Sequence, residues 1–113
     1  MSTFRYWQTP RAGNMARLTL YTGNLPALAD NHVRIKVHAV GLNFADIFAL
    51  TGLYSATPQG AFIPGLEFAG EVQEVGQQTQ GVAVGDRVMG VTRFGGYPSV
   101  IDSGADYLIP LPP

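Results

Sequence analysis

The chain contains no cysteine, and this absence excludes disulfide bonds and thiolate metal sites. Charge is also scarce, because only 13% of the 113 residues are charged and the formal net charge at pH 7 is −1. The seven basic residues include a single lysine and form no basic patch that could neutralise a row of phosphates. We therefore expect no nucleic-acid partner.

Long hydrophobic runs are missing as well. No apolar stretch reaches the roughly 18 residues that a membrane span requires. The N-terminal sequence MSTFRYWQTPRAG lacks the continuous apolar core of a signal peptide. We therefore expect a cytoplasmic protein with no integral membrane segment. The length favours one domain, and a hydrophobic content of 46% is sufficient for a packed core.

Fourteen glycines and eight prolines separate short β-prone runs, which is typical of a barrel or a sandwich. The clearest run is HVRIKVHAV, where strict alternation predicts a half-buried strand whose polar face carries Arg34, Lys36 and His38. A phase change near Gly70 predicts a β-bulge in the run LEFAGEVQEVG. Further strands are expected at residues 3–8 and 15–22, in RVMGV and in GGYPSVIDS.

One short helix is expected in NFADIFALT, ending at Gly52. A helix of two turns cannot form the crossover that parallel strands require, so the sheet should be mostly antiparallel. Asn43 is a preferred N-cap residue, and Asp46 suits the first turn of the helix. Capping alone explains both side chains without a ligand, and it is compatible with a second role in a site.

Several common signatures of enzymes are absent from the sequence. There is no G-x-G-x-x-G fingerprint for a dinucleotide, no G-x-x-x-x-G-K-[ST] phosphate loop and no serine or cysteine in a nucleophile elbow. The two histidines, His32 and His38, belong to the alternating strand region, and His38 is interpreted as an ordinary surface residue. The residues by themselves do not predict a complete enzyme.

Five motifs in order, VRIKVHAVGLNFAD, TGLY, PGLEFAGEV, VGDRV and GGY, resemble the N-terminal GroES-like domain of the medium-chain dehydrogenase/reductases. The resemblance extends from about Arg17 to Pro110. GLNFAD with TGLY is similar to the zinc-independent, quinone oxidoreductase-like branch. GDRVMGVTRFGGY is most similar to bacterial relatives of the vesicle amine transport protein type. The resemblance implies a mainly β, partly open and mostly antiparallel barrel over residues 1–113, with one or two short helices.

In function, the resemblance implies a catalytic-domain fragment of an NADPH-dependent, zinc-independent quinone or enone oxidoreductase. Such an enzyme transfers a hydride to a conjugated carbonyl. NADPH would be bound mainly by a nucleotide-binding domain that is absent from this chain, so the isolated chain should be inactive. The positions of two zinc ligands and of a proton-relay hydroxyl correspond to Asn43, Leu66 and Ala45, so no metal is expected.

The resemblance also implies the site residues. Asn43, Asp46 and Tyr54 would contact the cofactor, and Asn43 and Tyr54 would act in catalysis. Other interpretations stay open for several residues. Tyr54 could instead be an aromatic that closes the turn after the helix. Glu67 is interpreted as a structural acid at the start of a strand, which pairs with a basic residue outside this chain. Arg93 and Phe94 either line the acceptor pocket or lie on plain surface.

Two further functional readings stay open: a non-catalytic binding module, and a free-standing barrel that acts through protein or membrane partners. A domain separated from its neighbour would expose an apolar face, expected at Ile47, Phe48, Leu50 and the YLIPLPP tail. Such a face predicts self-association or a homo-oligomer.

Overall fold

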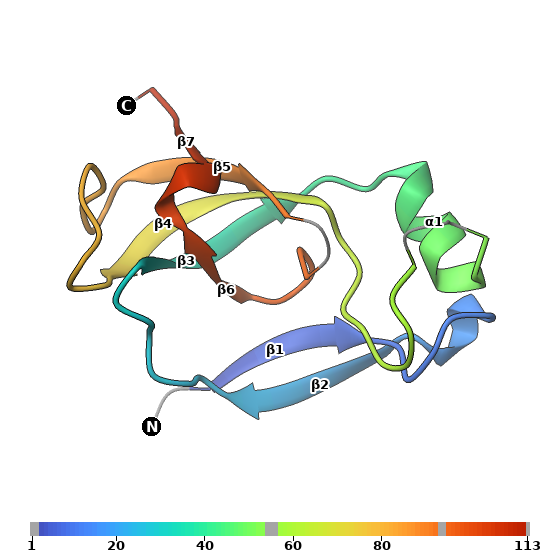
Figure 1. Cartoon of the computed structure of the whole chain (residues 1–113). Coiled ribbons are helices and arrows are strands. Elements are labelled where there is room, and N and C mark those ends of the chain that lie inside the picture. Colours follow the sequence, from blue (N-terminus) through green and yellow to red (C-terminus); the bar gives the residue numbers. More distant parts are fainter. Residues whose placement is uncertain (1–2, 54–56, 93–94, 113) are drawn as a thin grey trace.

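The computed structural model describes residues 3–53, 57–92 and 95–112. In these ranges the chain forms a two-stranded ribbon, β1–β2, and a five-stranded sheet in the order β6-β3-β4-β5-β7 (Figure 1). Every strand pair is antiparallel, and the larger sheet stays open between its edge strands. The predicted mainly β, partly open antiparallel architecture is confirmed. The elements are β1 (Thr3–Gln8), η1 (Met15–Arg17), β2 (Thr19–Asn24), β3 (His32–Val40), α1 (Phe44–Thr51), β4 (Glu67–Val75), β5 (Arg87–Val91), β6 (Val100–Gly104), η2 (Ala105–Tyr107) and β7 (Leu108–Pro110).

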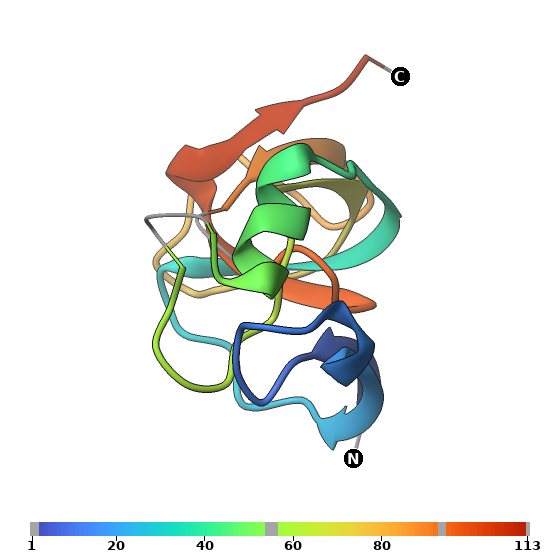
Figure 2. The same ribbon diagram turned by 90° about the vertical axis from the view of Figure 1, so that its right-hand side faces the viewer.

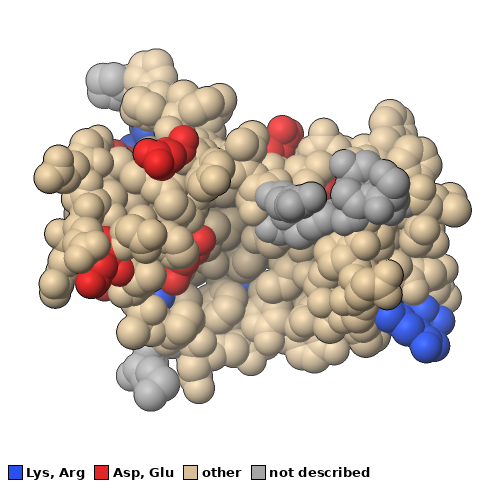
Figure 3. Space-filling view, in the orientation of Figure 1, with Lys and Arg blue, Asp and Glu red and all other residues tan. Residues whose placement is uncertain are grey.

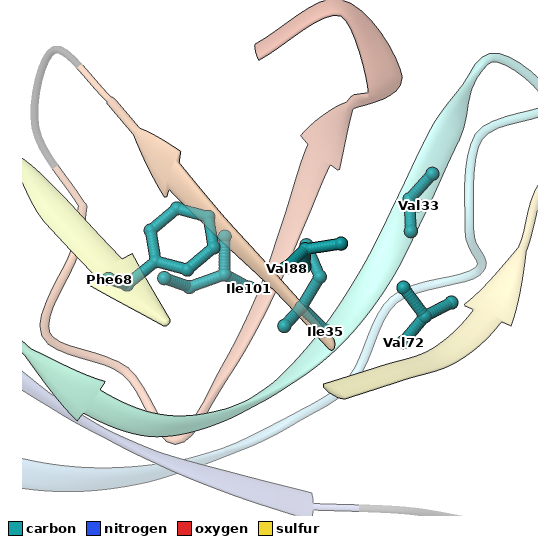
Figure 4. Packing of buried hydrophobic residues seen from close by; sticks show 6 residues of the cluster. All are labelled: Val33, Ile35, Phe68, Val72, Val88 and Ile101. Atoms are coloured by element: carbon teal, nitrogen blue, oxygen red, sulfur yellow. The ribbon is translucent and has the colours of Figure 1, made fainter. Parts of the chain in front are cut away.

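The main core lies against the centre of the larger sheet. β3 is the run HVRIKVHAV, and it pairs with β4 on one side and with β6 on the other. Val33 and Ile35 are fully buried, and they pack with inward-facing side chains of the other strands (Figure 4). Removing each such side chain from water contributes about 1.5–3 kcal/mol to folding. The cluster consists of Val33, Ile35, Phe68, Val72, Val88 and Ile101.

The expected polar face of β3 is wrong at one position. Lys36 and His38 are exposed, but Arg34 is only 7% exposed. Its guanidinium donates from Nε and a terminal nitrogen to the two carboxylate oxygens of Asp102 on β6, at 2.8 and 2.9 Å. It also donates to the carbonyl of Pro26, in the loop that precedes β3. The hydrogen bond to Asp102 raises the pKa of Arg34, so the charge stays fixed where loop and sheet meet.

The bulge predicted near Gly70 is present, with its extra residue on the neighbouring strand. Val37 pairs with Gly70 and Ala39 pairs with the residue before it, so His38 is the inserted residue of β3. Gly70 is required by a close approach, because a Cβ there would collide with the carbonyl oxygen of Lys36.

The strand predicted at residues 15–22 begins later. Its first residues form the short helix η1, and the side chain of Asn14 caps that helix by accepting from the N–H of Ala16 at 2.9 Å. The strand expected from GGYPSVIDS is likewise shorter. Gly96 and Tyr97 hydrogen-bond to the loop before β4, and Ser99 donates its N–H to the carbonyl of Arg5 in β1. In both cases other partners satisfy the backbone groups that a longer strand would have paired.

The helices η1 and α1 lie at one end of the molecule, to the right in Figure 1, and the ribbon β1–β2 runs along one side of the open sheet (Figures 1 and 2). Thr9 and Phe62 exchange two backbone hydrogen bonds of 3.0 Å, which attach the end of β1 to the loop before β4. A smaller core of Ala49, Leu50 and Phe62 holds this end together. None of the helices in the described ranges is long and apolar enough to cross a bilayer.

The apolar face expected on the helix is present only in part. Ile47 and Phe48 are 43% and 46% exposed, whereas Leu50 is 3% exposed because it belongs to the smaller core. Larger exposures occur at the two ends of α1, where Leu42, Phe44 and Leu53 are between 77% and 79% exposed. In the tail, Ile109 is 52% exposed.

Candidate functional site

The candidate site is built around the first turn of α1. Asn43 has the extended backbone of an N-cap residue, and Gly52 ends the helix in the left-handed conformation with φ +82°. The Asp46 carboxylate reaches back, and its Oδ2 accepts a hydrogen bond of 3.0 Å from the backbone N–H of Asn43. The Asp46 half of a capping box is thus formed, and the N–H of Asp46 donates to the backbone carbonyl oxygen of Asn43 at 3.0 Å. The predicted positions of the pair, Asn43 at the N-cap and Asp46 in the first turn, are confirmed.

A third residue, Tyr97, completes the cluster. Its hydroxyl donates a hydrogen bond of 2.9 Å to the same Oδ2 atom of Asp46. Burial, then the hydrogen bond to this carboxylate and its charge, raise the pKa of the Tyr97 phenol above its usual range. The phenol therefore keeps its proton at neutral pH and remains the donor in this contact.

Asp46 itself is unusual for a carboxylate, because it is only 3% exposed. Its Oδ2 accepts two hydrogen bonds, but its Oδ1 is buried without a partner among the described residues. An unsatisfied buried acceptor costs about 1–3 kcal/mol. A ligand that donates a hydrogen bond to Oδ1 would recover that cost.

Two glycines hold Tyr97 in place. Gly96 donates to the carbonyl oxygen of Gly65 at 3.0 Å, and the N–H of Tyr97 donates to that of Pro64 at 3.1 Å. A Cβ at Gly65, where φ is +109°, would lie 2.5 Å from the Tyr97 ring and 2.8 Å from the Cα of Gly96. Glycine is therefore required at Gly65 by a close approach as well as by its backbone conformation. The bare backbones of Gly65 and Gly96 also let the motifs PGLEF and GGY meet beneath the helix.

A cleft of about 650 Å³ opens above the cluster. Asn43, Asp46 and Tyr97 are its polar lining residues, and the rest of the lining is apolar. No charged side chain other than Asp46 is among the lining residues that the structure describes. On the face shown in Figure 3, most acidic side chains lie over the sheet end, and the surface around α1 is largely uncharged. The apolar lining residues are Met15, Leu18, Leu42, Phe44, Ile47 and Leu50.

The structure thus brings together two of the three residues expected at the site. Asn43 and Asp46 share the cleft, whereas Tyr54 lies outside the described residues. Arg93 and Phe94 also lie outside them, so their expected positions are not described. Sequence reasoning missed Tyr97 as a site residue, although the GGY motif that carries it was among the signals for the family.

Glu67 does not join the cluster. It is exposed at the first position of β4 and lies over Gly41, where a Cβ would collide with its carboxylate. The carbonyl of Glu67 accepts a backbone hydrogen bond of 3.2 Å from Gly41. The backbone hydrogen bond fixes the segment between β3 and α1, and the interpretation of Glu67 as a structural acid stays a prediction.

The positions that the resemblance assigns to zinc ligands carry an amide and an alkyl side chain, Asn43 and Leu66. Across residues 3–53, 57–92 and 95–112, no group of three or more histidine, cysteine, aspartate or glutamate side chains is placed to hold a metal ion.

Residues 29–112 match the family described as the alcohol dehydrogenase GroES-like domain. A quinone oxidoreductase-like protein 2 homolog of Nematostella vectensis is 46% identical over 69 residues, which are 61% of this chain and 19% of that relative. The human synaptic vesicle membrane protein VAT-1 homolog-like is 29% identical over 100 residues, 88% of this chain and 24% of that protein. The chain therefore spans about a fifth to a quarter of the length of these curated relatives.

Solved structures show the same relationship. The crystal structure of a human VAT-1 homolog-like protein matches with a TM-score of 0.91 and 27% identity, covering 98% of this chain and 36% of that one. Escherichia coli quinone oxidoreductase complexed with NADPH matches with a TM-score of 0.83 and 26% identity, covering 96% of this chain and 33% of that one. Fold, motifs and relatives agree, and the chain belongs to the alcohol dehydrogenase GroES-like domain family of the medium-chain dehydrogenase/reductases, among quinone oxidoreductase-like relatives.

Proposed function

We propose that this chain forms the substrate-facing wall of the active site in an NADPH-dependent, zinc-independent quinone or enone oxidoreductase. A nucleotide-binding domain would form the other wall. The observation that carries the proposal is the Asn43–Asp46–Tyr97 cluster in the apolar cleft. Several relatives are quinone oxidoreductases or quinone oxidoreductase-like proteins, and one was solved in complex with NADPH, which supports the same chemistry.

The described residues fit one end of NADPH. The nicotinamide end needs an apolar slot with a few polar groups, and the cleft offers Asn43, Asp46 and Tyr97 among apolar side chains. The phosphate end needs cationic side chains or a glycine-rich turn before a helix. No lysine or arginine is among the described residues that line the cleft, and the sequence contains no such fingerprint. The phosphates would therefore be bound by the second domain.

Bound NADPH would supply a hydride, which carries the two electrons of the reduction. With one proton from solvent, a quinone becomes a hydroquinone, or an enone becomes a saturated ketone, while NADPH becomes NADP⁺. The half-exposed Asn43 lines the cleft, and its amide is a neutral donor for the acceptor's carbonyl oxygen as negative charge develops there. Conjugated acceptors suit such a donor because their charge is delocalised. Tyr54 is proposed as a second donor, to this oxygen or to the ribose.

Asp46 and Tyr97 have a different role in this proposal. The Tyr97 hydroxyl is committed to Asp46, and the Asp46 carboxylate is committed to the backbone N–H of Asn43. Together they hold the first turn of α1, so that the Asn43 side chain meets the acceptor in one orientation. They are positioning residues, with Asp46 also contacting the cofactor through its free oxygen.

A binding role without catalysis is the second candidate. The exposed side chains of Leu42, Phe44 and Leu53, at the two ends of α1, are the observation that favours it, because large apolar side chains of this exposure commonly meet a partner. The partner would be a protein, a membrane surface or a second copy of this chain.

The deciding experiment uses the complete protein, in which this chain is joined to its nucleotide-binding domain. NADPH oxidation would be followed spectroscopically with a panel of quinones and enones, and zinc would be measured by elemental analysis of untagged protein. We expect turnover with at least one conjugated acceptor and no stoichiometric zinc. Binding of NADPH without turnover of any acceptor would favour the binding role. Stoichiometric zinc would overturn the metal-free site.

The 113-residue chain alone provides a second test. It should bind NADPH too weakly to detect by calorimetry, because a few hydrogen bonds of about 1 kcal/mol each do not offset the cost of immobilising the ligand. Light scattering on the same sample should detect self-association through the apolar face. Micromolar NADPH binding, or a clean monomer at high concentration, would contradict the corresponding half of this expectation.

A further inference from the structure

A second apolar chamber adjoins the cleft. It has a volume of about 360 Å³, and its lining residues are Trp7, Leu18, Val40, Leu42 and Tyr97. Three of these, Leu18, Leu42 and Tyr97, also line the larger cleft, so the two spaces share a wall. The chamber has no use in the proposed hydride transfer, because it lies on the side away from Asn43 and Asp46, neither of which lines it.

The chamber is held rigidly in the fold. Tyr6 of β1 forms an antiparallel bridge with Pro98, a register that sets Trp7 opposite Tyr97. Arg5 fixes that register from the other side, because its carbonyl accepts from the N–H of Ser99 at 2.7 Å and its N–H donates to the hydroxyl of Ser99 at 2.9 Å. Tyr97 therefore lies opposite Trp7 of β1, and its hydroxyl bonds to Asp46 of the polar cluster. Tyr97 thus belongs to the walls of both spaces.

The side chains that line the chamber determine which kind of chemical group can bind there. Among the described lining residues the chamber offers four apolar side chains and one phenol whose hydroxyl is already bonded to Asp46. Apart from the indole N–H of Trp7, the described lining residues offer no free hydrogen-bonding side chain, and they carry no charge that could bind a carboxylate or a phosphate. Trp7 is 42% exposed, so a neutral hydrocarbon group placed on the indole would remove apolar surface from water.

We propose that this chamber is a subsite for the apolar side chain of the acceptor, and that Trp7 is a specificity-determining residue. The acceptor is then a neutral quinone whose ring reaches Asn43 in the cleft and whose hydrocarbon substituent passes Tyr97 to lie on Trp7. The inference rests on the proposed function for the ring, but the binding of the tail can be tested without turnover. It predicts a preference for tailed quinones over small ones, and over acceptors with a charged substituent.

The binding test uses the 113-residue chain and two probes that share one ring: dimethoxy-methyl-benzoquinone, and the same quinone with a decyl side chain. Calorimetry should give at least about tenfold tighter binding for the decyl compound, since burial of only two or three methylene groups suffices for that ratio. Trp7→Ala should bring the two affinities close together, and Trp7→Phe should restore most of the difference. Leu20→Ala is the matched control. Leu20 pairs with Trp7 across the ribbon and is similarly exposed at 43%, but it does not line the chamber.

Trp7 also provides a direct probe, because it is the only tryptophan in the chain. Decanol, which has the tail without the ring, should shift the fluorescence of wild-type protein to shorter wavelength as the indole loses water. Equal affinities of the two quinones, together with unshifted fluorescence, would overturn the subsite. A tail preference that Trp7→Ala leaves unchanged would also overturn it.

The complete protein separates this inference from the proposed function. If it reduces both quinones, the ratio of their kcat/KM values should favour the decyl compound, and Trp7→Ala should reduce that ratio about tenfold. Turnover of both quinones with a ratio that Trp7→Ala does not change would reject the subsite and keep the reductase. No turnover, combined with tighter decyl binding that depends on Trp7, would reject the reductase and keep the subsite.

Discussion

Each of the two ends of this domain contains a buried charged side chain, but the two charges differ in how completely they are hydrogen-bonded. At the sheet end, which also holds the main apolar core, the buried guanidinium of Arg34 donates hydrogen bonds to Asp102 and to the carbonyl of Pro26. At the helix end, the buried carboxylate of Asp46 keeps one oxygen without a partner among the described residues, and large apolar side chains are exposed around it. The sheet end is thus held by contacts within the fold, whereas the helix end is where we propose that a ligand binds. We therefore expect that stability and ligand binding can be perturbed separately.

The largest expected effect belongs to the sheet end. Arg34→Ala should lower the free energy of unfolding by about 3–5 kcal/mol, because it leaves Asp102 without its partner in a largely buried position. Urea denaturation measures this effect. The double variant Arg34→Leu with Asp102→Leu should be clearly more stable than the single variant, because no buried charge is left uncompensated.

A single variant as stable as the wild type would contradict the view that this pair holds the sheet end together. Neither variant should alter quinone binding at the helix end, since neither residue lines the cleft or the chamber. A parallel loss of binding would show that the two ends are coupled.

At the helix end, Asp46→Ala should cost less, about 2 kcal/mol. It removes one half of the capping box and leaves the Tyr97 hydroxyl without its acceptor. Asp46→Asn is the matched control, because the amide keeps one oxygen for the same two donors and should recover most of the loss. Thermal unfolding followed by circular dichroism compares the three proteins. Equal destabilisation by both substitutions would mean that the charge, and not the acceptor atom, carries the effect.

Local patterns predicted the parts of both ends that depend on neighbours in sequence. The alternation in HVRIKVHAV identified β3 with its bounds, and the capping preferences of Asn43 and Asp46 identified the start of α1. The burial of Arg34 and the role of Tyr97 could not be predicted in this way. Their partners, Asp102 and Asp46, lie 68 and 51 residues away in the sequence. Period and propensity carry no information about pairing over such separations, so only the register of the sheet and the contact of Gly65 with Gly96 bring these residues together.

Tyr97→Phe should cost about 1 kcal/mol at neutral pH, because Asp46 loses one of its two hydrogen bonds. Its clearer signature is the pH dependence of stability. The pKa of Tyr97 is raised in the folded state, so the unfolded chain releases this proton first, at a pKa of about 10. The contribution of Tyr97 is therefore complete below pH of about 10 and is lost as the pH rises toward the folded-state pKa.

Unfolding by urea at a series of alkaline pH values should accordingly show a shallower loss of stability for Tyr97→Phe than for the wild type. Tyr107→Phe is the matched control, because Tyr107 is 65% exposed and lines neither the cleft nor the chamber. Its alkaline profile should follow the wild type. Parallel profiles for all three proteins would show that the phenol of Tyr97 ionises no differently in the folded and unfolded states.

The smallest change in stability, with the most selective change in function, is expected for Asn43→Asp. Stability should stay within about 0.5 kcal/mol of wild type, because aspartate caps a helix about as well as asparagine. Turnover of a quinone by the complete protein should fall about a hundredfold, since a carboxylate replaces the neutral donor where negative charge develops on the acceptor.

Asn43→Ser is the control that keeps both a cap and a neutral donor, so it should retain stability and part of the turnover. If Asn43→Asp leaves turnover and NADPH affinity unchanged while Asn43→Ala unfolds at a lower temperature, capping is the whole role of Asn43. In that case Asn43 would contribute only to stability, and Asp46 and Tyr97 would be the polar residues of the cleft that face the ligand.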